Sequence, residues 1–511
     1  MTTSSDLLAI PTAQELIRGC AARFPDVPAI INTLDDNCLL TYSQLARVVF
    51  AAAARWEPDL RGRVVLVRGA LDEHLIVDLL ALLCAGAIIH PIAASASVEV
   101  FAHTAVQLGA VAVRTPEEIS FPGATDVKVL LPVPWAPGDA EPGEQDPDDV
   151  AFYFKTSGTS GLPKVAVLTH QAVFTGVAVT SQHILGKLNL GPGSVTVPLL
   201  PAHHVLGTVA AVLTAMDHGF TLGCAHNMKN LPAVMQHYQP RILVAVPMIV
   251  EGIWKLSQSA RVKAAGMGPK ELLGGRLDYL ICGAAPLPAS LVDRLSASGV
   301  RVLNGYGMTE CSGVVSCQTG PKESVGGVGR AVGDVIRTRI VDGQLQIAGP
   351  TLMSGYLVDG ELDRSPVSSG WLATGDLAEI CSDGEIVLTG RSKNIIILGD
   401  GNNVSPEQIE RELTEFPSVT EAIVTAEPLG LGGRDVLAAT CVCDGITGGE
   451  VSEYPGITVV GRVPQSVVGA VATVNSQAPA HRQIRVVRVA PDDVPRSDLG
   501  KIVRRKLTWQ R

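Results

Sequence analysis

Short apolar runs alternate with longer stretches of helical periodicity along most of the chain. Runs of strand length, rich in Val, Leu and Ile, lie at Arg63–Val67, Val127–Leu131, Ile242–Val246 and Tyr279–Cys282. Continuous apolar strands separated by helices are typical of parallel sheets that are covered on both faces. The pattern therefore predicts an α/β fold.

Two stretches depart from this rhythm. The most apolar one, Leu79–Ile89, is bounded by Asp78 and His90 and is shorter than the roughly 20 residues that a bilayer crossing needs. We expect it to be a buried helix leading into a strand, and we expect no membrane span. The segment Pro137–Asp149 is rich in Pro, Gly, Asp and Glu without an apolar period, which predicts a surface loop.

The pattern changes after Arg391. A short strand is expected over Asn394–Leu398, followed by a Gly/Asn turn, an amphipathic helix over Pro406–Phe416 and further strands. We predict two domains, a large N-terminal α/β domain over residues 1–391 and a small α+β domain over residues 392–511. The natural hinge is Arg391–Asn394.

Composition narrows the class of protein. The 511 residues are 46% hydrophobic and 18% charged, which excludes a disordered chain. A formal charge of −10 without a basic block argues against a nucleic-acid partner. The N-terminus lacks the pattern of a signal peptide, so a cytoplasmic location is expected. The ten cysteines form no CxxC pair, and Cys441 and Cys443 are better explained as one face of a strand than as a metal or redox site.

The clearest chemical motif follows the apolar, strand-like segment Val150–Lys155. It is a loop of small hydroxyl residues and glycines: Thr156, Ser157, Gly158, Thr159, Ser160, Gly161, Leu162, Pro163 and Lys164. Such a loop presents backbone N–H groups and hydroxyls to a polyphosphate, and the lysine adds positive charge. It is not a P-loop, because no Ser or Thr follows Lys164. Taken alone, it is either a nucleotide site or an ordinary turn.

The whole string resembles the phosphate loop of the adenylate-forming superfamily, which includes acyl-CoA synthetases, nonribosomal adenylation domains and luciferases. Val165 departs from that family, which usually has glycine there. Further motifs follow in the family's order, closest in pattern to the acyl- or aryl-CoA ligases: Gly283–Pro288, Asn304–Glu310, Trp371–Asp376, Gly390–Asn394 and Pro495–Ile502.

The resemblance implies a nucleotide site. Tyr306 would stack on adenine, Thr309 would meet the phosphate, and Glu310 would hold Mg²⁺, since carboxylates suit that cation. Asp376 would bind the ribose hydroxyls and Arg391 the ribose or phosphate. The other implied nucleotide-binding residues are Gly283, Ala284, Ala285, Pro286, Asn304, Gly305, Gly307 and Met308.

The resemblance also implies the catalytic groups. Lys501 would bridge the carboxylate of the acid and the α-phosphate, with Thr309 and Glu310 beside it; Asp498 departs from the usual residue of this motif. His204 would lie next to the acyl group. Members of the family that activate α-amino acids carry an aspartate near this place to hold the ammonium group of the substrate. No aspartate lies between Leu199 and Gly207, which disfavours an α-amino acid as the substrate. The substrate pocket would be lined by His204, Met248, Gly283, Ala284, Gly307 and Met308.

The implied activity depends on ATP and Mg²⁺. A carboxylic acid, which is aryl, cinnamoyl-like or medium acyl, would become an acyl adenylate with release of pyrophosphate. The small domain would then rotate about Lys393 and bring the Gly399–Gly401 region towards a second nucleophile. That nucleophile would be the thiol of coenzyme A or of phosphopantetheine on a free-standing acyl carrier protein.

Several alternatives remain open at the level of sequence. An amine, or nitrite as in diazo-forming homologues, would also accept the adenylate. An inactive nucleotide or acyl sensor is disfavoured by the retention of Glu310 and Lys501. A P-loop phosphotransferase is disfavoured by the missing GK[ST] pattern. The identity of the acid and the oligomeric state are not fixed by the sequence.

Overall fold

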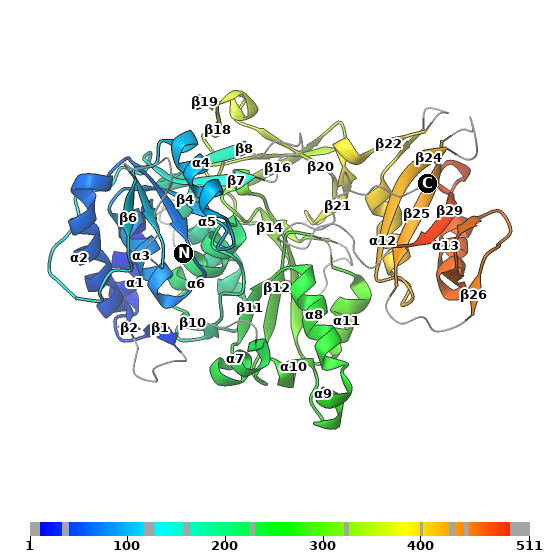
Figure 1. Ribbon diagram of the computed structural model, residues 1–511, viewed down its shortest axis with the longest axis horizontal. Helices are drawn as coiled ribbons and strands as arrows, with labels where there is room; N and C mark the ends of the chain where they lie inside the picture. Colours follow the sequence, from blue (N-terminus) through cyan, green and yellow to red (C-terminus); the bar gives the residue numbers. More distant parts are fainter. Residues whose placement is uncertain are drawn as a thin grey trace.

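In the computed structural model of the protein, the described residues are 11–32, 40–116, 127–156, 164–224, 230–285, 287–320, 327–398, 402–428, 435–443 and 449–490. They form a large α/β unit followed by a smaller unit at one end of the molecule, drawn in orange and red (Figure 1).

The largest sheet of the described part has nine strands in the order β15-β14-β13-β12-β11-β9-β10-β1-β2. Its centre, from β13 to β1, is parallel, and the strands at both edges are antiparallel. The strands are β1 (Pro28–Asn32), β2 (Leu40–Thr41), β9 (Val195–Thr196), β10 (Thr221–Cys224), β11 (Ile242–Ala245), β12 (Tyr279–Cys282), β13 (Arg301–Tyr306), β14 (Ser316–Cys317) and β15 (Arg330–Ala331).

A second sheet has eight described strands in the order β19-β18-β8-β7-β4-β3-β5-β6. The strands from β6 to β7 are parallel, whereas β8, β18 and β19 extend the sheet antiparallel. The bounds are β3 (Val64–Arg68), β4 (Ile88–Ile92), β5 (Ala112–Arg114), β6 (Lys128–Leu130), β7 (Val150–Thr156), β8 (Lys164–Thr169), β18 (Gly355–Val358) and β19 (Glu361–Asp363).

Helices cover both sheets, and several begin at a polar N-cap. The side chains of Thr12, Thr41, Asp72 and Thr169 each accept a hydrogen bond from a backbone N–H of the first turn. The helices are α1 (Ala13–Arg23), α2 (Tyr42–Leu60), α3 (Glu73–Cys84), α4 (Val98–Leu108), α5 (His170–His183), the 3₁₀ turn η2 (Leu185–Lys187), the π-helix η3 (Leu206–Leu213), α6 (Thr214–Asp217), α7 (Leu231–Tyr238), α8 (Pro247–Ser257), α9 (Ala260–Ala264), α10 (Pro269–Leu272), α11 (Ala289–Ala297) and the 3₁₀ turn η5 (Thr309–Cys311).

The two sheets share one hydrophobic core. Buried residues of α1, α2, α3 and α5 and of strands from both sheets belong to a single cluster. The helix α3 is buried on all sides, as expected for a helix between layers. A third, antiparallel sheet adds β16 (Arg337–Val341), β17 (Gln344–Ala348), β20 (Leu372–Ile380) and β21 (Ile386–Arg391), with the short turn η6 (Ser365–Val367) before β20.

The smaller unit has a core of its own, made of buried residues between Leu398 and Val487. The strands β24, β25, β29 and β27 form its sheet, on which α12 and α13 pack. Its elements are η7 (Ser392–Asn394), β22 (Ile396–Ile397), β23 (Asn403–Val404), α12 (Pro406–Thr414), β24 (Glu421–Pro428), β25 (Asp435–Val442), β26 (Glu450–Val451), β27 (Thr458–Val460), β28 (Val463–Pro464), α13 (Gln465–Gln477), η8 (Ala480–Arg482) and β29 (Ile484–Val489).

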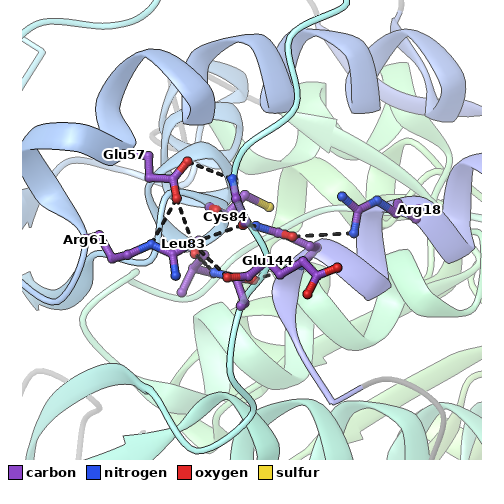
Figure 2. Close-up of polar contacts among 9 residues, drawn as sticks. Arg18, Glu57, Arg61, Leu83, Cys84 and Glu144 are labelled. Atoms are coloured by element: carbon purple, nitrogen blue, oxygen red, sulfur yellow. Dashed lines mark hydrogen bonds and ion pairs between the residues drawn. The ribbon is translucent and has the colours of Figure 1, made fainter.

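The segment 137–146 has no regular structure and crosses the surface beside α1, α2 and α3; we call it the strap. Figure 2 shows Glu57 and Arg61 of α2 reaching its backbone: Glu57 accepts from the Gly143 N–H at 2.7 Å, and Arg61 donates to the Glu144 carbonyl at 2.8 Å. The buried Gln14 donates to the carbonyls of Gly143 and Cys84. The strap is thus fastened by side chains.

These observations confirm the main predictions from sequence. The predicted strands match β3, β6, β11 and β12, the apolar stretch is α3 leading into β4, and the amphipathic helix is α12. The predicted surface loop, Pro137–Asp149, comprises the strap and the turn that follows it, and it is mostly exposed. Cys441 is buried, and Cys443 packs against the same core. Among the helices that the structure describes, none has the length and apolarity required to cross a bilayer.

Candidate functional site

A cavity of about 670 Å³ opens where the two large sheets meet the antiparallel sheet. Its lining comes from segments far apart in the chain, including β4, β7, β8, η3, β13, η5, β18, β20 and η7. Most predicted site residues in the described ranges line it: Thr156, Lys164, His204, Gly283, Ala284, Gly305, Tyr306, Gly307, Met308, Thr309, Glu310, Arg391 and Lys393.

The two ends of the phosphate loop are paired at the cavity. Thr156 ends β7 and Lys164 begins β8, and the Thr156 hydroxyl donates to the Lys164 carbonyl at 3.3 Å. Lys155, which directly precedes Thr156, also lines the cavity, so two lysines lie at the ends of this loop. The predicted residues Ser157, Gly158, Thr159, Ser160 and Gly161 lie outside the described residues, as do Pro286, the Gly399–Gly401 region and Lys501.

Tyr306, Asp376 and Arg391 form a hydrogen-bonded group. The strands β20 and β21 place Asp376 directly opposite Arg391, whose Nε donates to Asp376 Oδ1 at 2.7 Å. The Tyr306 hydroxyl donates to Asp376 Oδ2 at 2.7 Å. Burial, reinforced by the charge of Asp376, raises the pKa of Tyr306 well above its ordinary value, so the phenol remains a donor. Asp376 itself is buried just behind the lining.

Glu310, Tyr356 and Lys164 form a second group. The Tyr356 hydroxyl donates to Glu310 Oε1 at 2.7 Å, and the Lys164 ammonium lies 4.8 Å from the centre of the Tyr356 ring. All three residues line the cavity. Burial, together with the nearby charge of Glu310, raises the pKa of Tyr356. An anion and a cation are thus held on one aromatic side chain.

A close backbone approach explains one of the small residues, and another has a strained backbone. A Cβ on Gly307 would lie 1.6 Å from the Gly313 carbonyl oxygen, so only glycine fits there. Ala284 has a φ of +74°, a left-handed conformation that is uncommon for residues other than glycine. Such strain is often found at ligand sites.

Part of the cavity lining comes from the nine-stranded sheet and from α5, η3 and α6, with the residues that directly follow α5; we call this part the arm. His203 and His204, which directly precede η3, also line the cavity, and their ring centroids are 4.1 Å apart. The residues of the arm are uncharged, and nine of the thirteen are buried: Thr180, Ile184, Leu185, Thr196, Leu206, Ala210, Ala211, Thr214, Ala215, Phe220, Ile242, Val244 and Ile281. Their chemistry suits an apolar ligand with few polar groups.

The structure corrects one predicted position. Met248 is 47% exposed in the first turn of α8 and does not line the cavity. The helix buries Val250, Ile253 and Ser257, and a residue two positions before Val250 points to the opposite face. Asn304 and Ala285 also lie outside the lining, within the strand and the turn that carry Gly305 and Ala284.

Tyr356 was missed by sequence reasoning. It reaches the cavity because β18 pairs with β8, with Tyr356 opposite Ala166. This pairing joins segments about 190 residues apart in the chain, and no local pattern around Tyr356 indicates it. His90, whose Nδ1 lies 2.8 Å from the Tyr153 carbonyl oxygen, is a second lining residue that the sequence did not single out.

Known proteins are similar to this chain in sequence and in fold. The chain matches the model of the AMP-binding enzyme family over residues 17–357. Feruloyl-CoA synthase of Amycolatopsis sp is 28% identical over 462 residues, covering 84% of this chain and 89% of that protein. The solved anthranilate CoA ligase AuaEII, in complex with anthranoyl-AMP, superposes with a TM-score of 0.81 at 18% identity, covering 99% of this chain and 98% of that one.

Coverage of other relatives is partial. Long-chain-fatty-acid–CoA ligase FadD15 of Mycobacterium bovis is 28% identical over 322 residues, which are 55% of this chain and 52% of that protein. The chain thus spans about half the length of this curated relative. The family model, however, matches well over half of the chain, and the solved structure has the same fold. The protein belongs to the AMP-binding enzyme family.

Proposed function

We propose that the protein uses ATP to activate a carboxylic acid as an acyl adenylate, releases pyrophosphate and transfers the acyl group to a thiol. The observation that carries this proposal is the convergence on one cavity of Lys164, Glu310 and Arg391 with an uncharged arm. Phosphate-binding charge and an apolar compartment in one cavity suit a nucleotide and an acid side by side. The relatives described above are named as CoA ligases or synthases, which supports the same reaction class.

Charge at the cavity favours a polyphosphate. Among the described residues of the lining, Lys155, Lys164, Arg391 and Lys393 are cationic and Glu310 is acidic; Asp376, just behind the lining, is paired with Arg391. Clustered cations at a partly enclosed surface raise the local potential for an anion. We propose that Tyr306 stacks on adenine, that Asp376 and Arg391 bind ribose, and that Lys164 and Thr309 meet the phosphates.

The donors near Glu310 fit Mg²⁺. Mg²⁺ is usually held by one or two carboxylates together with water and substrate phosphates. Glu310 offers one carboxylate at the cavity, and no cluster of three or more His, Cys, Asp or Glu residues lies within the described ranges. When bound, Mg²⁺ would neutralise charge on the phosphate oxygens. Glu310 would hold it there.

In the chemical step, a carboxylate oxygen of the acid bonds to the α-phosphorus. The bond from that phosphorus to the bridging oxygen of the β-phosphate breaks, and pyrophosphate leaves with the electron pair. We assign Lys501 to the charge that develops on the α-phosphate and carboxylate, on the strength of its motif. His204, which lines the cavity two residues before Leu206 of the arm, would contact the acyl group.

The lining of the arm favours an acid whose tail carries no charge. Its residues carry hydroxyl or apolar side chains, which favours aryl, cinnamoyl-like or medium acyl acids. Ala211 tests this assignment because it is buried and lines the arm. Ala211→Phe is expected to raise KM for a cinnamoyl-like acid by about tenfold or more, with propionate little affected, because the ring occupies the arm.

The hinge is proposed at Lys393, between domains 1–391 and 392–511. The smaller unit also contacts β21 through side chains: Arg411 donates to the Leu388 carbonyl at 2.6 Å, and the Ser405 hydroxyl donates to the Thr389 carbonyl at 2.7 Å. A rotation about the hinge would break these bonds before the acyl group is transferred. The acceptor we propose is the thiol of coenzyme A, or of phosphopantetheine on an acyl carrier protein.

The test is pyrophosphate release with a panel of acids, run with and without coenzyme A, with products identified by mass. Release that depends on the acid, together with an acyl-CoA product, supports the full proposal. An adenylate that reacts with an amine or with nitrite but not with a thiol would show that the acceptor is not a thiol. No pyrophosphate with any acid would indicate a sensor, and ADP would indicate a phosphotransferase.

Lys501→Ala separates the two half-reactions. The variant is expected to lose acid-dependent exchange of pyrophosphate into ATP, because charge on the α-phosphate is no longer neutralised. Exchange that survived, with only thiol transfer lost, would contradict the assigned role.

A further inference from the structure

Tyr356 links the two charged groups on which the proposed phosphate and metal chemistry depends. Its hydroxyl donates to Glu310 at 2.7 Å, and its ring lies under the Lys164 ammonium at 4.8 Å. All three side chains line the same cavity.

The backbone fixes this arrangement. Leu357 pairs with Val165 and Tyr356 with Ala166, so Tyr356 and Lys164 are diagonal neighbours on one face of the sheet. The Met353 N–H donates to the Glu310 carbonyl at 2.8 Å, which ties η5 to the chain just before β18. The three residues are therefore held by main-chain hydrogen bonds as well as by their side chains.

The contacts also orient Glu310. A carboxylate whose one oxygen accepts a phenolic hydrogen bond loses rotational freedom and keeps its remaining lone pairs directed elsewhere. Hydrogen bonds of this kind orient the carboxylates that bind metals, and their loss commonly costs 10- to 100-fold in metal affinity. The ring, in turn, gives Lys164 a favourable contact on its electron-rich face.

We propose that Tyr356 is a positioning residue: its hydroxyl orients Glu310 for Mg²⁺, and its ring holds the Lys164 ammonium at the phosphates of ATP. The proposal rests on the proposed function, since it takes Glu310 as the metal-binding carboxylate. It assigns separate tasks to two parts of one side chain, and two variants separate them.

Tyr356→Phe keeps the ring and removes the hydroxyl. Binding of α,β-methylene-ATP, an analogue that cannot release pyrophosphate, is measured by calorimetry in EDTA and across a Mg²⁺ titration. The Mg²⁺ concentration at half-maximal enhancement is expected to rise about 10-fold or more. Affinity in EDTA is expected to stay within about twofold, because the ring contact with Lys164 remains. Tyr356→Leu is expected to weaken binding in EDTA as well.

Tyr153→Phe is the matched control. Tyr153 lies on β7 of the same sheet, is partly buried and does not line the cavity. Its substitution should therefore change neither the Mg²⁺ concentration at half-maximal enhancement nor the affinity in EDTA. Thermal unfolding of each variant verifies that it is folded. In a Glu310→Gln background, Tyr356→Phe should have no further effect on the Mg²⁺ dependence, because a residue that acts through Glu310 is not additive with its loss.

Three results would overturn the inference. Tyr356→Phe could match Tyr153→Phe in its Mg²⁺ dependence, it could weaken binding equally in EDTA, or its effect could persist undiminished in Glu310→Gln. Wild-type protein that binds the analogue without any Mg²⁺ enhancement would instead overturn the metal role of Glu310, and with it both proposals. The two failures are therefore distinguishable from the wild-type titration alone.

Discussion

His170 is a buried histidine without a hydrogen-bond partner for either ring nitrogen among the described residues. It stacks on Phe174, with centroids 5.7 Å apart and planes at 12°. Burial lowers its pKa from the ordinary 6.5 to about 4, because a charged ring would have no solvation there. The neutral ring is thus the form that the fold accepts.

The consequence is acid sensitivity. Between pH 6.5 and 4 the unfolded chain binds a proton at this histidine and the folded chain does not, so stability is present above pH 6.5 and falls as the pH drops. The loss approaches about 1.4 kcal/mol per pH unit from this group. His170→Phe should flatten the slope of unfolding free energy in denaturant titrations over this range. The exposed His103→Gln controls for histidine loss, and an unchanged slope in His170→Phe would contradict the explanation.

Asp78 and Arg114 form a fully buried ion pair. Arg114 Nε lies 2.7 Å from Asp78 Oδ2, both side chains are 1% exposed, and the other Asp78 oxygen accepts from the Val133 N–H. Burial raises the pKa of Asp78 despite the opposing effect of Arg114. The ionised form of Asp78 therefore depends on the ion pair with Arg114.

Arg114→Met is expected to cost about 3–5 kcal/mol in urea unfolding, because it leaves a buried carboxylate without its cation. Asp78→Leu added to Arg114→Met should restore much of this loss. Lys128→Met removes an ion pair that is more than half exposed on both sides and should cost less than about 1 kcal/mol. Equal effects of the buried and exposed changes would refute the argument.

At this scale the sequence predicted many of the residues that meet at the cavity, including Lys164, Tyr306, Glu310 and Arg391. It did so because each of these residues lies in a short motif of neighbouring positions that can be recognised from the sequence alone. Tyr356 and Met248 show the limit. The first depends on a strand pairing between distant segments, and the second depends on the rotational phase of α8.

Among the elements, the strap shows how an irregular segment becomes ordered. The Gln14 amide, 1% exposed on α1, donates to the carbonyls of Cys84 at 2.9 Å and Gly143 at 2.7 Å. It therefore joins α1 to both α3 and the strap. Composition predicted the loop, but the side chains that fasten it come from helices about 80 to 130 residues earlier in the chain.

Gln14→Ala is expected to lower the free energy of unfolding by roughly 2 kcal/mol, because it leaves the Cys84 carbonyl buried without this donor. Arg18→Ala, on the same helix, removes the exposed ion pair with Glu141 and a long hydrogen bond of 3.4 Å to Gln14 Oε1 but keeps both Gln14 amide donors, and should cost less than about 1 kcal/mol. Denaturant titration of both variants measures the difference. A Gln14→Ala effect no larger than that of Arg18→Ala would show that the amide does not fasten the strap.

Element types were easier to predict than their partners. The apolar runs gave the parallel strands because burial on both faces needs continuous hydrophobicity. The π-helix η3 was not predicted, since its sequence Leu206–Leu213 reads as an ordinary apolar helix. Its five-residue spacing is visible at its C-terminal end, where the backbone N–H of Thr214 donates to the Val209 carbonyl.

The whole molecule has separate hydrophobic cores. The core of the smaller unit lies between Leu398 and Val487, and the main core of the large unit includes strands of all three sheets. The sequence predicted a smaller C-terminal unit, and the structure has one. How the two are oriented depends on few contacts, such as Arg411 to Leu388, which no sequence pattern indicates.

Separate cores predict two thermal transitions in calorimetry of the full chain. Ile409→Ala and Ile347→Ala each remove a fully buried side chain, one from each core, at a cost of about 2–5 kcal/mol. Each should lower one transition and leave the other in place, and ATP should raise the transition that Ile347→Ala lowers. A single transition shifted equally by both variants would show that the units unfold as one.

The fastening of the strap has a consequence for protease resistance. Ten residues without helix or strand on the surface would ordinarily be a preferred site of nicking, because a protease must draw an extended backbone into its own cleft. Here the carbonyls of Gly143 and Glu144 and the N–H of Gly143 are already bonded to Gln14, Glu57 and Arg61, so cleavage must wait for these bonds to open. The rate of cutting in this segment therefore reports the local opening of α1 and α2, and a folded sample should stay intact there.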